Sequence, residues 1–178
     1  NSGPNFPHSL GLLYSALTFY LGWKHHSDEG IIMGLAPFGN PYAKHKGKKF
    51  IDYFKNIIID KNGYDYEINR EWISYHIQRN TWISKKFINT FGKPRKPNSK
   101  ILQIHKHLAA ALQLRLEQIV LKKLKYLKKK YKINNLAIAG GVGLNCSLNG
   151  KIEKSKIFKK IFVQPASGDS GTAIGAVY

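Results

Sequence analysis

Hydrophobic side chains recur every three or four residues in two stretches of the chain, which is the spacing of a helix that buries one face. In residues 99–131 this apolar stripe runs from Leu108 to Tyr131, and Ser99 is placed to cap the helix. In residues 9–23 the stripe is formed by Leu10, Leu13, Tyr14, Leu17 and Leu21. We therefore expect a helix over residues 9–23 and a long amphipathic helix over residues 99–131.

Between these two helices the pattern is less regular. The apolar residues 31–41 are interrupted by Gly and Pro, which predicts a shaped loop or a short helix that ends at the first proline. Basic and apolar positions in residues 50–59 indicate an amphipathic segment. It is followed by a predicted turn at residues 60–63, a strand at residues 64–68 and a loop at residues 92–98. The aromatic side chains of the middle segment are expected in the core, namely those of Trp72, Tyr75, Trp82 and Phe87.

Two units of strand, glycine loop and helix follow the long helix. The strands are predicted at residues 136–139 and 161–164, the loops at residues 140–145 and 165–171, and the helices at residues 148–153 and 172–178. In α/β proteins, ligands bind at the carboxyl ends of strands, where helix N-termini offer backbone N–H groups to phosphate. The pattern therefore predicts an α/β fold with a nucleotide site at the two loops.

The first loop has the residue types that a phosphate site requires. Gly140, Gly141 and Gly143 carry no Cβ atom, so backbone N–H groups can approach a phosphate closely. Asn145 can cap the next helix or bind the ligand. Cys146 stands where a dinucleotide fingerprint needs glycine, and no P-loop sequence occurs, so neither of these two phosphate-binding loops is present.

In the second loop, Asp169 lies between Gly168 and Ser170. Its carboxylate can cap the following helix or coordinate a divalent cation held against phosphate, and both interpretations stay open. No two of the chain's 7 histidines are three or four residues apart, so no helical histidine pair is predicted to bind metal.

The chain is strongly basic, with 29 Lys and Arg against 10 Asp and Glu and a formal net charge of +19. Arginine, the residue that reads base edges, supplies only 4 of these cations, so the charge favours a solvated surface over specific nucleic-acid recognition. A lysine-rich nucleic-acid-binding module is the alternative, and its binding would weaken steeply with salt. With a single cysteine and no apolar run of about 20 residues, we expect a cytoplasmic protein with no membrane partner.

Four blocks of sequence are similar to one known family. They are residues 136–150 (LAIAGGVGLNCSLNG) and 161–178 (IFVQPASGDSGTAIGAVY), with residues 9–23 and 33–39 (MGLAPFG) upstream. In this order, and spanning nearly the whole chain, they resemble the O-carbamoyltransferases that act on nodulation factors and antibiotics. The resemblance implies an incomplete actin-like ATPase (ribonuclease H-like) fold.

The resemblance also implies a reaction. Proteins of this family make carbamoyl adenylate from carbamoyl phosphate and ATP in a separate C-terminal domain, and then transfer the carbamoyl group to a hydroxyl of a sugar or secondary metabolite. Asp169 would be a ligand of a divalent metal, iron or alternatively magnesium, and no catalytic residue is assigned. The nucleotide would be bound by Gly140, Gly141, Val142, Gly143, Asn145, Gly168 and Gly34.

By the same resemblance, residues 1–178 are expected to be part of the N-terminal domain. The family's pair of histidine metal ligands and its adenylate-forming domain would belong to missing parts of the same protein. The family often has Lys at the position of Ile31 and Ala at that of Gly143; the first difference removes a cation from the expected pocket. Threonylcarbamoyl transfer to tRNA, or a sugar-kinase-like ATPase of the same fold, is the alternative.

Overall fold

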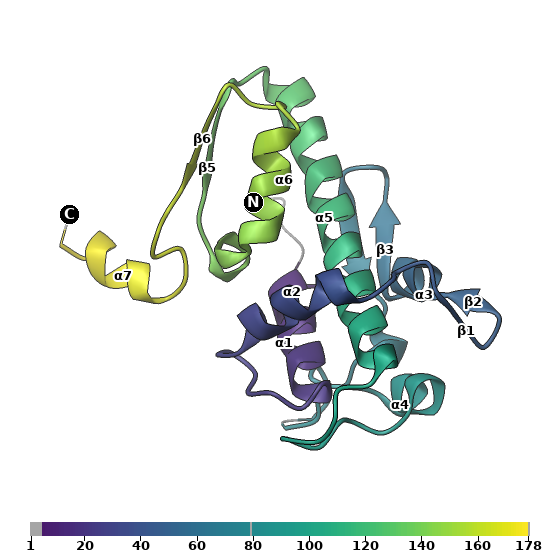
Figure 1. Ribbon diagram of the computed structural model, residues 1–178. Coiled ribbons are helices and arrows are strands. Elements are labelled where there is room, and N and C mark those ends of the chain that lie inside the picture. The colour runs from purple at the N-terminus through teal and green to yellow at the C-terminus, as the bar shows by residue number, and fades with distance from the viewer. Residues whose placement is uncertain (1–4, 79, 178) are drawn as a thin grey trace. The chain divides into compact units, whose positions relative to one another are not determined.

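The computed structural model describes residues 5–78 and 80–177 of the chain (Figure 1). Within these residues the structure is mixed α/β, with seven α-helices and three two-stranded sheets. The chain divides into two compact units, Asn1–Leu116 and Glu117–Tyr178. The division falls within the long helix α5 (Gln103–Tyr131).

The first predicted helix is confirmed as α1 (Leu10–Tyr20). The side chain of Ser9 caps it by accepting a hydrogen bond from the Leu12 N–H at 3.2 Å, and the predicted apolar stripe is almost entirely buried. The next apolar segment forms the short helix α2 (Glu29–Leu35), followed by the 3-10 turn η1 (Ala36–Phe38). Of the two alternatives for this segment, the short helix is therefore confirmed.

The middle of the first unit differs from the prediction at a hairpin. After α3 (Phe50–Ile57), strands β3 (Ile58–Lys61) and β4 (Asp65–Ile68) pair antiparallel, with Ile58 opposite Ile68. The predicted turn at residues 60–63 is wrong in its first half, because cross-strand pairing keeps residues 60 and 61 in β3.

Four further elements of this unit were not predicted. Strands β1 (Lys44–His45) and β2 (Lys48–Lys49) form a short hairpin, η2 (Arg70–Trp72) is a 3-10 turn, and α4 (Lys85–Phe91) is capped by Ser84. The Phe87 and Trp72 side chains are 1% and 5% exposed, which confirms that they lie in the core. Tyr75 and Trp82 are only half-buried, so the prediction is wrong for these two.

The long helix begins four residues later than expected. Ser99 does not cap it, because the Ser99 hydroxyl donates to the Lys96 carbonyl at 2.7 Å. His105 supplies the capping bond instead, since its Nδ1 accepts from the Leu102 N–H at 3.0 Å. The His105 ring therefore accepts a hydrogen bond from an N–H at the start of the helix, and this is the role that the sequence pattern predicts for the Ser99 side chain.

The second unit contains the two predicted repeats. Strands β5 (Asn135–Ile138) and β6 (Lys160–Val163) are parallel, and α6 (Cys146–Lys154) connects them. The loop after β5 contains the 3-10 turn η3 (Gly141–Leu144), and the loop after β6 leads into α7 (Ser170–Gly175). The arrangement of a long helix followed by two strand–glycine loop–helix units is thus confirmed.

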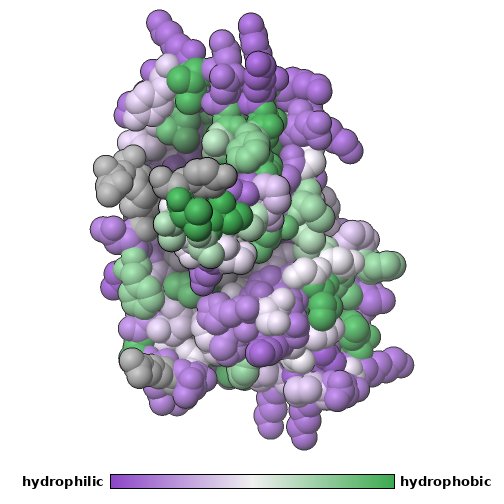
Figure 2. Space-filling view, turned by 90° about the vertical axis from the view of Figure 1, so that its left-hand side faces the viewer, coloured by the Kyte–Doolittle hydropathy of each residue, from purple (hydrophilic) through white to green (hydrophobic). Residues whose placement is uncertain are grey.

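Several large hydrophobic side chains of the second unit are exposed, including Phe162 at 59%, Leu144 at 58% and Ile174 at 47%. Figure 2 shows one face of the molecule, on which groups of hydrophobic side chains lie among projecting hydrophilic ones. None of the helices within residues 5–78 and 80–177 has the length and apolar character that a membrane span requires.

Candidate functional site

The two glycine loops of the second unit meet at one edge of the β5–β6 sheet. Because the strands are parallel, their carboxyl ends lie at the same edge. The Gly140 N–H donates to the Ser167 carbonyl at 2.7 Å, and the Gln164 N–H donates to the Ile138 carbonyl at 3.1 Å. The structure therefore brings together two loops that are about 20 residues apart in the sequence.

The glycines of the first loop have two different surroundings. A Cβ atom on Gly143 would lie 3.0 Å from the Ser167 Oγ and 3.2 Å from the Ile138 Cγ2, so Gly143 packs against the second loop. A Cβ atom on Gly140 or Gly141 would meet nothing within 4 Å. Gly140 has a φ of +98°, a conformation that favours glycine. Gly140 and Gly141 are thus the positions at which a ligand can approach the backbone.

Asn145 caps helix α6. Its Oδ1 accepts a hydrogen bond from the Leu148 N–H at 2.9 Å, and its own N–H donates to the Val142 carbonyl at 3.1 Å. The half-buried Val142 and the cap thereby fix the end of the glycine loop to the start of the helix.

We expect the substitution Asn145→Ala to destabilise the second unit by about 1 kcal/mol, because it removes the acceptor for the Leu148 N–H. Asn145→Asp, which keeps an acceptor of the same length, should retain most of that stability. Thermal unfolding of the two variants measures the difference. Equal stability of the alanine variant and the unsubstituted chain would contradict the capping role.

Two buried polar atoms beside these loops have no hydrogen-bond partner among the described residues. They are the Oγ of Ser167, whose side chain is 5% exposed, and the Oδ1 of Asn149. The Asn149 Nδ2 donates to the Gly143 carbonyl at 2.7 Å, so this side chain is held against the first loop. An unpaired buried polar group is costly unless a ligand or water completes it. The sequence patterns did not single out either residue.

Asp169 is exposed at the start of α7. Its side chain makes no capping hydrogen bond, although its main-chain carbonyl accepts from the Thr172 hydroxyl at 2.6 Å. Among the described residues, no group of three or more His, Cys, Asp or Glu side chains is arranged to hold a metal ion. Asp169 therefore offers a single carboxylate.

The two other predicted nucleotide contacts have different positions. Gly168 lies beside the first loop, since a Cβ atom on it would be 3.5 Å from the Leu144 Cδ1. Gly34 belongs to the first unit, where it is exposed on α2. The structure thus groups all the predicted residues of the second unit at the two loops and assigns Gly34 to a separate element.

Parallel strands that end in paired glycine loops at helix N-termini define a class of phosphate-binding α/β site. Residues 1–178 match the family model described as carbamoyltransferase N-terminus. The chain belongs to this carbamoyltransferase N-terminus family.

Curated relatives support the assignment over almost the whole chain. An uncharacterized protein of Synechocystis, sll1178, is 41% identical over 97% of this chain and 27% of its own length. The nodulation protein NolNO of Sinorhizobium fredii is 41% identical over 94% of the chain and 22% of its own length. The nodulation protein NolO of Bradyrhizobium diazoefficiens is 37% identical over 97% of this chain and 28% of its own length. The chain thus spans about a quarter of the length of these relatives.

Proposed function

We propose that the protein to which this chain belongs is a cytoplasmic O-carbamoyltransferase. It transfers a carbamoyl group from carbamoyl phosphate, through ATP-derived carbamoyl adenylate, to a hydroxyl of a sugar or secondary metabolite. The observation that carries the proposal is the junction of the two glycine loops by the Gly140–Ser167 hydrogen bond, within a member of the carbamoyltransferase family. We also propose that the domain has the actin-like ATPase fold, which the parallel β5–α6–β6 unit supports.

The loops serve to bind the adenylate. The Gly141 N–H is the proposed donor to the phosphate on the open side of the loop, with the α6 N-terminus nearby. Gly140, whose own N–H donates to the Ser167 carbonyl, contributes the absence of a side chain there. The Ser167 hydroxyl, which has no partner among the described residues, donates a hydrogen bond to the ligand. Such fixed donors stabilise negative charge that develops when a hydroxyl attacks the carbamoyl carbon.

A divalent cation, iron or magnesium, would supply further stabilisation of the charged phosphate and the reacting carbonyl oxygen. Asp169 fits this role as one carboxylate ligand at the edge of the loops, because its side chain is exposed and makes no capping bond. Since a single carboxylate does not hold a catalytic metal, the other ligands come from parts of the same protein outside residues 1–178.

We expect Asp169→Ala, made in the intact protein, to lower metal content and to reduce carbamoyl transfer by at least about 100-fold. Carbamoyl-phosphate-dependent release of pyrophosphate from ATP should persist, because the proposal assigns that step to another domain. Glu153→Ala, which removes an exposed carboxylate on α6, is the matched control.

Two results would contradict the proposal. Full metal content and full transfer rate in the Asp169→Ala protein would remove Asp169 from the site. If the unsubstituted protein released no pyrophosphate with carbamoyl phosphate and ATP, threonylcarbamoyl transfer to tRNA or a sugar-kinase-like ATPase would replace carbamoylation as its activity.

A further inference from the structure

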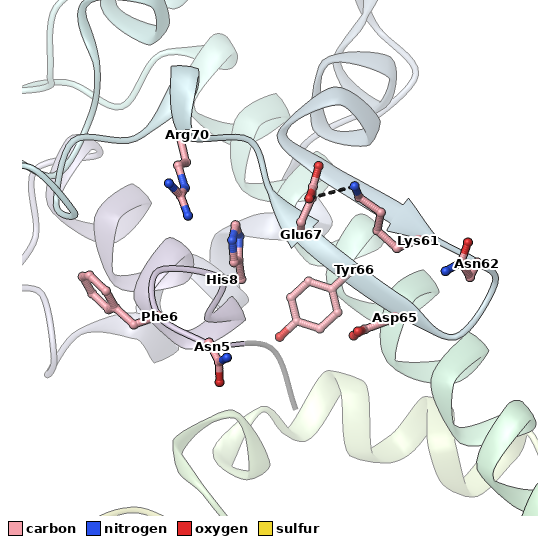
Figure 3. Close-up of a pocket in the computed structure, with 9 residues that line it drawn as sticks. All are labelled: Asn5, Phe6, His8, Lys61, Asn62, Asp65, Tyr66, Glu67 and Arg70. Carbon is pink, nitrogen blue, oxygen red and sulfur yellow. Dashed lines mark ion pairs between the residues drawn. The ribbon is translucent and has the colours of Figure 1, made fainter. Parts of the chain in front are cut away.

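A pocket of about 560 Å³ lies in the first unit, between the residues that precede α1, the β3–β4 hairpin and η2 (Figure 3). Aromatic side chains line it at Phe6 and Tyr66, and amides at Asn5 and Asn62. Its charged lining residues are divided between two ends. Figure 3 shows the Arg70 side chain pointing toward His8 at one end, whereas Lys61, Asn62 and Asp65 lie toward the hairpin turn.

The cations of the pocket differ in their partners. The Lys61 Nζ is 2.9 Å from the Glu67 Oε2, so these two charges neutralise each other. The guanidinium of Arg70 makes no ion pair or hydrogen bond with the described residues, and it extends toward His8 (Figure 3). Arg70 therefore presents a complete set of N–H donors to a ligand.

His8 is oriented as a second donor at the same end. Its Nδ1 accepts a hydrogen bond from the Ile68 N–H at 3.0 Å. In the neutral imidazole the proton must then reside on Nε2, which becomes an N–H donor. The β4 backbone thus fixes both the ring and its tautomer.

His76 reports the electrostatic character of this end. Burial lowers the pKa of its imidazole, and its electrostatic interactions with Arg70 and His8 lower the pKa further. Its buried Nδ1 has no hydrogen-bond partner among the described residues. Arg70, His8 and His76 therefore interact electrostatically, and an anion placed near them would favour the protonated form of His76.

We propose that Arg70 and His8 bind the phosphate group of a small phosphorylated ligand at this end of the pocket. Phosphate suits the site because the Arg70 fork can donate two parallel hydrogen bonds to it while the His8 Nε2–H donates a third. The Phe6 side chain, which is 66% exposed, lines another part of the pocket. This site is separate from the glycine loops and does not depend on the proposed carbamoyl transfer.

The test is a titration of the intact protein with inorganic phosphate at constant ionic strength, with acetate as the carboxylate probe. Arg70→Ala should weaken phosphate binding by about tenfold or more, and Arg70→Lys, which keeps the charge without the fork, by less. The matched control is Lys96→Ala, which removes a charge from an exposed loop of the same unit. Phosphate should also raise the pKa of His76, followed by NMR.

The possible results separate a site from general attraction to a basic chain. Phosphate binding that survives Arg70→Ala, or that falls equally in the Lys96→Ala protein, would overturn the proposal. Acetate binding as tight as phosphate binding would overturn the assignment of phosphate. A loss of phosphate affinity confined to the Arg70 variants, together with the rise in the His76 pKa, would support the site as proposed.

Discussion

The substitution Gly171→Ala is expected to reduce carbamoyl transfer by the intact enzyme by about 100-fold. A Cβ atom at position 171 would overlap the main-chain carbonyl oxygen of Ala166. Because that oxygen is backbone, no change of side-chain conformation removes the clash, and residues 166–170 must move. The movement displaces Ser167 and Gly168 from the first loop and shifts Asp169 with them. Misplacement of about 1 Å at a reacting centre costs this much rate.

Gly175→Ala is the matched control for this prediction. Gly175 lies in the same short helix α7, and a Cβ atom there would meet nothing within 4 Å. Its transfer rate should stay within about twofold of the unsubstituted enzyme. Steady-state transfer and pyrophosphate release are measured on both variants. A full transfer rate in the Gly171→Ala enzyme would show that the geometry of the second loop does not matter to the reaction.

The second unit is the part of the fold that the sequence predicts best. Short apolar strands, glycine loops and following helices occur twice, so local pattern and tertiary arrangement agree there. Parallel pairing of β5 and β6 then follows from the crossover through α6. Adjacency of the Gly140 and Gly168 loops is a direct consequence of that pairing.

The errors arise where a distant contact outweighs the local signal. Residues 60 and 61 read as a turn, yet pairing with β4 holds them in a strand. Ser99 reads as a helix cap, yet His105 takes that role from inside the helix. Ser167 gives no signal because a buried hydroxyl without a partner can be identified only once its surroundings are known.

The two glycines of the MGLAPFG segment have different surroundings in the structure, and the sequence does not distinguish them. The resemblance assigns Gly34 of this segment to the nucleotide site, although the segment has two glycines that look alike in the sequence. In the structure Gly34 is exposed on α2, and a Cβ atom there would meet nothing within 4 Å. Gly39 instead lies against α5, where a Cβ atom would overlap the Lys106 carbonyl oxygen and lie 2.9 Å from the Ala110 Cβ.

We therefore expect Gly39→Ala to lower the free energy of unfolding of the first unit by about 3 kcal/mol. The Lys106 carbonyl belongs to the backbone of the long helix, so the clash is relieved only by separating η1 from α5. Gly34→Ala should instead raise the free energy of unfolding by up to about 1 kcal/mol, because alanine is the better helix former.

Urea unfolding of the two variants measures these opposite changes in the free energy of unfolding. Binding of an ATP analogue to the intact protein tests the role of Gly34 separately. If Gly34 contacts the nucleotide, Gly34→Ala weakens binding without loss of stability, whereas Gly39→Ala weakens binding only as far as it unfolds the unit. Equal destabilisation by both substitutions would mean that Gly39 has no special packing against α5. A Gly34→Ala protein that binds the analogue with unchanged affinity would remove Gly34 from the nucleotide site.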